Sequence, residues 1–239
     1  NFPFELLIHD DASQDESQKI IATYASQYPN IVKPILQHEN QHSKRINPSV
    51  HFNYPRCSGE YIAFLEGDDF WTDENKLQSQ VEALDKYQNI NLCFHKATRI
   101  NYFNKNIKNI TIGEYAAEDT VIPYKNIFFR THGMVATGSC MIRSSAKENL
   151  QEFMKLRPYL TLGDLFMQFF GAYPNGAYYI NKTMSAYRFG TNGSWTANTI
   201  NDPEHKIRHE KSLLLAYTEL TKLTEGNLNK EINKIHLQR

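Results

Sequence analysis

Short apolar runs separated by an amphipathic helical pattern open the chain and restrict its fold more than any other feature. Residues 4–9 are mostly apolar, residues 20–28 place apolar side chains at helical spacing, and residues 31–36 are apolar again. This order predicts a strand, a helix and a second strand, the unit of parallel sheets, because parallel neighbours need a crossover connection. Ser13, with Glu16 three residues later, matches a capping box at the start of the helix. The chain therefore begins as an α/β protein.

The same alternation continues through the rest of the sequence. It predicts further strands at 61–65, 91–95, 138–142 and 177–180, and helices at 73–87, 145–156 and 165–170. Asp202 and Pro203 then open a charged amphipathic helix, because Asp is a favoured N-cap and Pro is favoured at the first helical position. We expect one α/β domain over residues 1–200 and a C-terminal helical extension over residues 201–239.

Length and charge restrict the class of protein. The 239 residues are enough to bury a substantial core. Lys and Arg total 26, as do Asp and Glu, so the formal net charge is zero and a general nucleic-acid binder is disfavoured. No apolar run approaches the roughly 18 residues of a membrane span. The three widely spaced cysteines argue against a disulfide framework or a thiolate zinc site, and a reducing compartment is the default.

Acidic residues follow two of the predicted strands. Asp10 and Asp11 end the first strand, and Glu66, Asp68 and Asp69 follow the strand at 61–65. The carboxyl ends of parallel strands share one edge of a sheet, so these side chains are expected to converge. Their mutual repulsion calls for a cation, and carboxylate oxygens favour Mg²⁺ or Mn²⁺, which bridge to phosphates. The pattern predicts a metal site that holds a nucleotide diphosphate.

Plainer readings exist for these residues. Asp10 and Asp11 are equally well explained as helix-capping carboxylates, whereas three acidic residues at 66–69 exceed what one cap can use. His205 and His209 have a metal-binding i, i+4 spacing but lack the Glu of a zinc-protease motif, so a surface helix face is the favoured interpretation.

Four segments together resemble the family 2 glycosyltransferases. Residues 5–17 (ELLIHDDASQDES) resemble the opening strand and Asp-Asp segment of that family, and residues 59–73 (GEYIAFLEGDDFWTD) are similar to its metal-binding D-x-D-D stretch. Gly163-Asp164 before an apolar helix looks like the acidic catalytic position, and residues 184–195 resemble the Tyr-Arg and Gly-rich segment that follows it. The resemblance covers most of the chain and is to enzymes of the bacterial surface-glycan type.

The resemblance implies a GT-A fold, with a mostly parallel sheet flanked by helices, and a role for each matching residue. Asp10, Asp11, Asp68 and Arg188 would bind the nucleotide: Asp10 and Asp11 its base and ribose, and Arg188 the leaving diphosphate. Glu66, Asp68 and Asp69 would hold the metal on the diphosphate. Asp164 would be the general base, and Trp195 would form a wall of the acceptor cleft. Ser139 is a further candidate for the acceptor side.

The implied activity is transfer of a hexosyl or N-acetylhexosaminyl group, with inversion, by a single displacement assisted by Mn²⁺ or Mg²⁺. The expected donor is a UDP- or dTDP-sugar, and the acceptor a glycan, a lipid-linked molecule or a protein. The expected setting is polysaccharide biosynthesis in the cytoplasm or at the inner face of the membrane. Peripheral membrane contact and homo-oligomerisation stay open.

The sequence departs from the family pattern in two places. Glu66 stands where Asp is commoner, and its extra methylene reaches farther. The family also begins with a strand and turn that help to cradle the nucleotide, and nothing before Phe4 matches them. We therefore expect the first strand of the sheet to be missing here and the natural chain to be longer at its front.

Two other functions compete with the enzyme. A non-catalytic module for nucleotide-sugars or glycans would keep the acidic motif without the transfer chemistry. A receiver-like signalling domain shares an acidic pair after its first strand, but the cluster at 66–69 and the chain length count against it.

Overall fold

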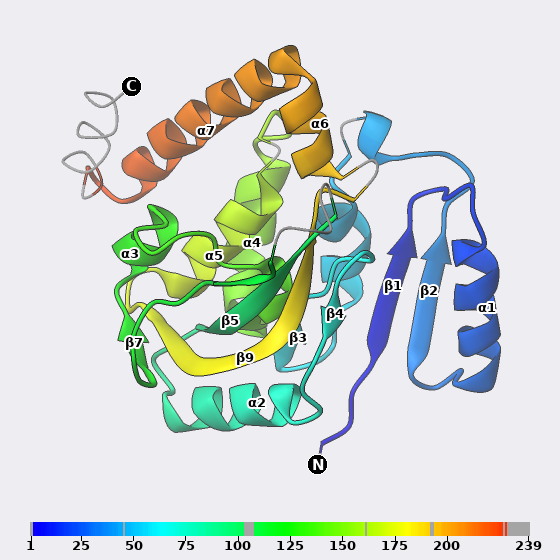
Figure 1. The fold of residues 1–239 in the computed structure, drawn as a ribbon, viewed down its shortest axis with the longest axis horizontal. Coiled ribbons are helices and arrows are strands. Elements are labelled where there is room, and N and C mark those ends of the chain that lie inside the picture. The colour runs from blue at the N-terminus through cyan, green and yellow to red at the C-terminus, as the bar shows by residue number, and fades with distance from the viewer. Residues whose placement is uncertain are drawn as a thin grey trace.

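A computed structural model describes residues 2–44, 46–102, 108–160, 162–191, 194–226 and 228 of the chain (Figure 1). The strands are β1 (Leu6–Asp10), β2 (Val32–Leu36), β3 (Tyr61–Ala63), β4 (Phe70–Trp71), β5 (Leu92–Asn101), β6 (Ile110–Ile112), β7 (Thr120–Ile122), β8 (Met141–Arg143) and β9 (Ala177–Phe189). The α-helices are α1 (Ser17–Gln27), α2 (Lys76–Lys86), α3 (Tyr124–Phe128), α4 (Ser144–Lys155), α5 (Gly163–Ala172), α6 (Trp195–Asn201) and α7 (Pro203–Leu223). Short helices include η1 (His42–Lys44) and η4 (Thr137–Ser139).

The predicted strand–helix–strand unit at the front of the chain is confirmed. β1 and β2 pair in parallel, with Leu6 opposite Val32 and Asp10 opposite Leu36. α1 is the crossover between them, and the three elements lie together at one side of the molecule (right in Figure 1). Asp10 is thereby placed at the carboxyl end of β1.

The other seven strands form one mixed sheet. Its order is β3-β8-β5-β9-β4, with β6 paired to β5 and β7 paired to β9. β5 and β9 run parallel through the middle, and the other pairings of this sheet are antiparallel. The expected α/β class is confirmed, with the parallel pairing located in β1–β2 and β5–β9. In the described structure β1 and β3 do not pair with each other.

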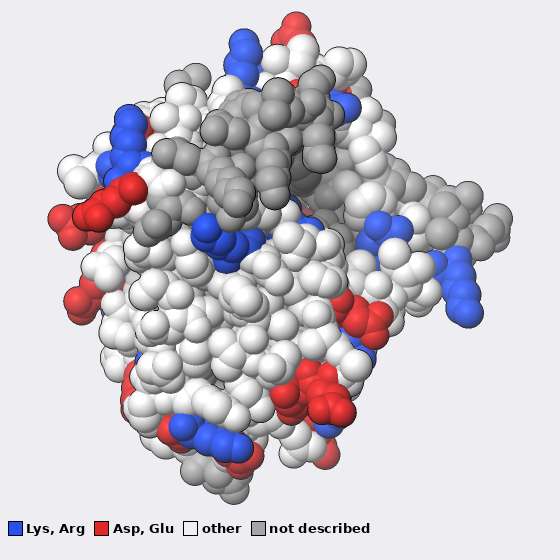
Figure 2. Space-filling view, turned by 90° about the vertical axis from the view of Figure 1, so that its left-hand side faces the viewer, with Lys and Arg blue, Asp and Glu red and all other residues white. Residues whose placement is uncertain are grey.

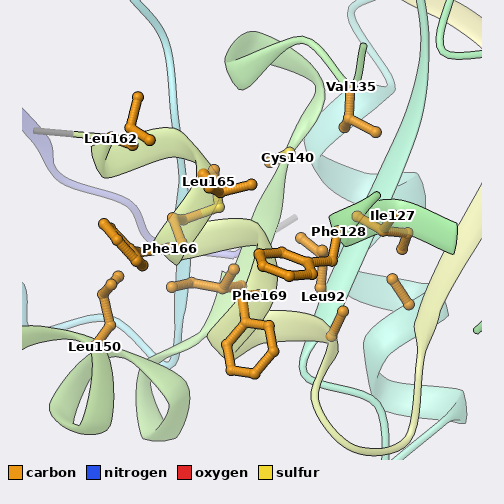
Figure 3. Packing of buried hydrophobic residues seen from close by; sticks show 14 of the residues in the cluster. Leu92, Ile127, Phe128, Val135, Cys140, Leu150, Leu162, Leu165, Phe166 and Phe169 are labelled. Carbon is orange, nitrogen blue, oxygen red and sulfur yellow. The ribbon is translucent and has the colours of Figure 1, made fainter. Parts of the chain in front are cut away.

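The main hydrophobic core lies around α5, which is mostly buried. Its side chains pack against others from β5, α3 and α4 (Figure 3). The labelled members are Leu92, Ile127, Phe128, Val135, Cys140, Leu150, Leu162, Leu165, Phe166 and Phe169. α7 crosses the end of the molecule opposite α2 (top of Figure 1) and adds Ala216, Tyr217 and Leu220 to the same core. The C-terminal helix is therefore packed onto the rest of the protein.

Two predicted helix starts have different outcomes. Asp202 is the N-cap of α7, and its Oδ1 accepts the Glu204 amide at 2.9 Å, as predicted. The Ser13–Glu16 capping box is wrong, because α1 begins only at Ser17 and Glu16 makes no side-chain cap bond.

Charged side chains of both signs are interspersed on the described part of the face seen in Figure 2. This mixture agrees with the net charge of zero. Within the described ranges, none of the helices combines the length and the apolar character needed to cross a bilayer.

Candidate active site

A cavity of about 1630 Å³ runs between the β1 side and the larger sheet, and it collects residues that are far apart in the sequence. Its walls include Glu66 and Asp68 from the loop between β3 and β4, Asp164 from the start of α5, and Arg188 from the end of β9. The acidic motif, the predicted base and the predicted diphosphate ligand therefore share one cavity. Of the carboxylates expected to converge, Glu66 and Asp68 line this cavity, whereas Asp10, Asp11 and Asp69 are not among its described lining residues.

Glu66 lies among other carboxyl groups in this cavity. Its side chain is reached by solvent through the cavity while protein walls surround it. Partial burial raises the pKa of Glu66 to about 7, and the charges of Asp164, Asp69 and Asp68 raise it further, while a hydrogen bond with Thr137 opposes the rise. A neighbouring cation would relieve this repulsion and restore the charged form.

Asp68 and Asp69 are held by the end of β9 in different ways. The Oδ2 atom of Asp68 accepts the Thr191 hydroxyl at 2.8 Å, and its carbonyl accepts Arg188 Nη1. Asp69 is buried, and its Oδ1 accepts the Arg188 backbone amide at 2.8 Å. Burial raises the pKa of Asp69 to about 6, although the Arg188 amide works against the rise. Asp69 thus anchors β9 beside the acidic loop.

Arg188 carries a cation into the cavity wall. Its guanidinium carbon stands 4.8 Å from the centre of the Phe70 ring, which fixes the plane of the group. Its buried Nε has no hydrogen-bond partner among the described residues. A planar guanidinium with an unfilled donor suits an anion with several oxygen acceptors, such as a diphosphate.

The donor set fits a metal ion that takes part of its coordination from a substrate. Among the described residues, no group of three His, Cys, Asp or Glu side chains is arranged to hold a metal. Glu66 and Asp68 nevertheless place two carboxylates in one cavity wall. Mg²⁺ is commonly held by one or two carboxylates, with substrate phosphates and water completing the shell.

Asp164 stands in the first turn of α5, where the helix dipole favours a negative charge. Its Oδ2 pairs with Arg130 Nη2 at 2.9 Å, and both side chains are a little over one-third exposed. Arg130 has φ +51, an unusual value for a residue other than glycine. The pair fixes the direction of the Asp164 carboxylate while leaving it open to the cavity.

Asp10 and Asp11 support the fold of the first unit. Asp10 is buried and accepts Gln18 Nε2 at 2.8 Å, while Asp11 accepts the amides of Gln41 and His42 at 2.8 and 2.9 Å. Neither aspartate is among the described residues that line the cavity. Asp11 thus binds amides at the start of η1, as the capping interpretation expects, whereas Asp10 is not the N-cap of α1.

Ser139 and Trp195 are the two residues that the sequence predicts on the acceptor side. Ser139 is completely buried, and its Oγ donates to the Ala136 carbonyl at 2.7 Å, so its placement in the acceptor cleft is wrong. Thr137, two residues earlier, lines the cavity instead. The side chain of Trp195 lies outside the described part of the structure.

Three further cavity residues were missed by sequence reasoning. Arg130 lies in a segment without clear periodicity, and Trp71 stands out in the sequence only as part of the segment that resembles the metal-binding stretch. The spacing of His209 predicts a surface helix face, yet His209 also lines the cavity, near Arg130 and Asp164. The spacing of His205 and His209 puts both residues on one face of α7, but only the packing of α7 in the structure shows that His209 borders the cavity.

Comparison with known proteins places the chain in a family. The model of the Glycosyl transferase family 2 matches residues 1–150. An uncharacterized protein of Mycobacterium tuberculosis is 43% identical over 98 residues, which cover 39% of this chain and 26% of that protein. EpsE of Bacillus subtilis is 27% identical over 170 residues, covering 70% of this chain and 56% of EpsE.

Solved structures agree on the fold. S. aureus TarS 1-349 in complex with UDP-GlcNAc matches with a TM-score of 0.64 at 15% identity, over 92% of this chain and 59% of that one. The same protein in complex with UDP matches with a TM-score of 0.59 at 15% identity, over 91% and 58%. The chain spans between 26% and 59% of the lengths of these relatives. With the acidic loop, the fold and the family model in agreement, the chain belongs to the family 2 glycosyltransferases.

Proposed function

We propose that the chain transfers a sugar from a nucleoside diphosphate sugar to a hydroxyl group, with inversion at the anomeric carbon. The observation that carries the proposal is the shared cavity of Glu66, Asp68, Asp164 and Arg188. It combines groups suited to a metal-bound diphosphate with a carboxylate that can serve as a base.

The donor side of the proposed site is the loop between β3 and β4 together with the end of β9. Asp68 and Glu66 would hold Mg²⁺ or Mn²⁺, which supplies positive charge to the departing diphosphate. Arg188 would add a second positive charge through its guanidinium. Asp69 would support this site indirectly, because its bond to the Arg188 amide keeps the end of β9 beside the acidic loop.

Asp164 is the proposed general base. It would accept the proton of the acceptor hydroxyl as that oxygen attacks the anomeric carbon and the bond to the diphosphate breaks. One base and one stabilised leaving group are sufficient for a single displacement, which inverts the configuration. Arg130 would hold the carboxylate in place until the acceptor arrives.

The donor is proposed to be a UDP-sugar, because the TarS structures that share the fold contain UDP and UDP-GlcNAc. A dTDP-sugar is the second candidate. For the acceptor we retain a glycan, a lipid-linked molecule or a protein. Polysaccharide biosynthesis in the cytoplasm, with or without membrane contact, is the setting that the family resemblance supports.

The test is Asp164→Asn, which keeps the size of the side chain but removes the base. We expect transfer to fall by about 10²–10⁴-fold while UDP binding is retained. Asp202→Asn is a matched control, because Asp202 also stands at a helix start and pairs with an arginine, Arg208, at 3.1 Å. Unchanged transfer in Asp164→Asn would refute the assignment of the base. Absence of transfer in the unmodified protein, with UDP binding intact, would favour the non-catalytic binding module.

A further inference from the structure

Lys76, at the start of α2, is a buried cation in an unusual setting. It is only 1% exposed, and burial lowers the pKa of its ammonium group to about 8. Its Nζ donates to Gln80 Oε1 at 2.7 Å and lies 4.4 Å from the centre of the Trp71 ring. No carboxylate lies within ion-pair distance of this Nζ among the described residues. Burial of an ammonium group without a carboxylate partner opposes folding, so its presence calls for another reason.

Both partners of Lys76 hold the short helix η4. Trp71 Nε1 donates to the Gly138 carbonyl at 3.0 Å, and Gln80 Nε2 donates to the Ser139 carbonyl at 2.8 Å. An ammonium group can only donate hydrogen bonds, so Lys76 fixes Gln80 with its oxygen inward and its nitrogen toward η4. The charge also holds the indole plane of Trp71.

The same short helix reaches the proposed donor side. Thr137, its first residue, lines the same cavity as Glu66, and it lowers the pKa of the Glu66 carboxyl group. Trp71 also lines the cavity. A continuous series of contacts thus leads from Lys76, through Trp71 and Gln80, to η4, and the first residue of η4 shares the cavity lining with Glu66.

We infer that Lys76 is a positioning residue for the donor side of the cavity: held between Trp71 and Gln80, its buried ammonium group fixes η4 against Glu66. The functional part of this inference rests on the proposed glycosyl transfer. The structural part, that Lys76 holds η4, stands on the contacts alone.

The test replaces Lys76 with Met, which keeps the length of the side chain and removes the charge and the donor. Hydrogen exchange of the Ser139 and Cys140 amides, which bond to the Ala136 and Thr137 carbonyls, reports on η4. In unliganded protein we expect this exchange to rise about tenfold with little change in Tm, because the stability gained by removing a buried charge offsets the loss of the hydrogen bond to Gln80. In the presence of Mn²⁺, the kcat/KM for UDP-GlcNAc should fall by about tenfold.

Lys86→Met is the control, because Lys86 lies on the same helix with its Nζ 5.3 Å from the Tyr87 ring but is exposed. It should leave both the exchange and the transfer unchanged. Unchanged exchange in Lys76→Met, or a loss of Tm with faster exchange throughout the sheet, would overturn the inference. These two measurements need no nucleotide, so they separate failure of this inference from failure of the proposed function.

A double-mutant cycle tests whether Lys76 acts through Trp71. Trp71→Phe keeps an aromatic ring but removes the bond to Gly138. If Lys76 and Trp71 act through the same element, the increase in the amide exchange rate at η4 in the double variant should be smaller than the product of the increases in the two single variants. Strictly multiplicative effects would contradict this route.

Discussion

Asp69→Asn should make the protein more stable at neutral pH, although it removes a charged residue of the acidic motif. Asp69 is only 8% exposed, and its Oδ1 accepts the Arg188 amide at 2.8 Å. An asparagine can keep this hydrogen bond through its own carbonyl oxygen. The substitution therefore removes the buried charge while it preserves the anchor of β9.

The magnitude follows from the shifted pKa. Burial raises the pKa of Asp69 from 3.8 to about 6, so between these values the folded protein holds a proton that the unfolded chain has lost. Stability consequently falls as pH rises through this window and stays lower above it. At 1.36 kcal/mol for each pKa unit, the charge lowers the free energy of unfolding by up to about 3 kcal/mol at pH 7. Asp69→Asn should recover much of this loss.

Urea unfolding in EDTA between pH 4 and pH 8 is the assay. The variant should be more stable than the unmodified protein above pH 6, and its stability should depend less on pH between 4 and 6. Asp73→Asn is the control of opposite sign, because hydrogen bonds from Lys182 and the Asn75 amide lower the pKa of Asp73. It should not stabilise the protein at neutral pH. A less stable Asp69→Asn protein at pH 7 would refute the reasoning.

Three further predictions concern the site and the fold. Metal-dependent UDP binding, measured by calorimetry, should weaken as pH falls below about 7, because protons compete with the metal for Glu66, and a flat profile would contradict this. Gly176→Ala should lower the free energy of unfolding by at least about 1 kcal/mol more than Gly133→Ala. Both glycines have φ +91, but only at Gly176 would a Cβ meet the Ile122 carbonyl oxygen, at 2.5 Å; equal losses in urea unfolding would count against the clash. Phe166→Ala, at a completely buried position, should cost about 3–5 kcal/mol by the same assay, and a loss below 1 kcal/mol would contradict its place in the core.

Local signals in the sequence predicted the fold well where one element decides the outcome. The Asp202–Pro203 cap needs only its own helix, and the structure has it as expected. The Ser13–Glu16 pair failed because a nearer competitor exists: Asp10 Oδ1 accepts the Ser13 amide at 3.0 Å, and Asp15 accepts the Ser17 amide at 2.9 Å. The capping-box motif is defined by residue spacing alone, so it does not take account of other acceptors nearby that bind the same amides.

Strand lengths were predicted less well than strand positions. β9 continues to Phe189, although its predicted core ends at Ile180, because its second half pairs with β5 through small and polar residues such as Ser185 and Ala186. Such residues lack a strong alternating pattern, so the local sequence does not show where the strand ends. The end is set by pairing with the neighbouring strand.

In the candidate site, too, some residues could be predicted from the local sequence and others could not. Glu66, Asp68 and Asp164 share a cavity, as the roles implied by the family resemblance require, whereas Asp10 and Asp11, which the strand ends were expected to bring there, do not line it in the described structure. Arg130 and His209 join the cavity lining only through the packing of α3 and α7, which no spacing within either segment encodes.

Thermal unfolding with nucleotides tests the central proposal of a metal-dependent donor site most directly. The protein is heated with UDP, dTDP, GDP or CMP, each with and without Mn²⁺. A ligand at one hundred times its Kd stabilises the native state by about 2.7 kcal/mol, which raises Tm by several degrees for a domain of this size. We predict a rise with UDP that requires Mn²⁺. No rise with any nucleotide, in the presence or absence of the metal, would contradict the account.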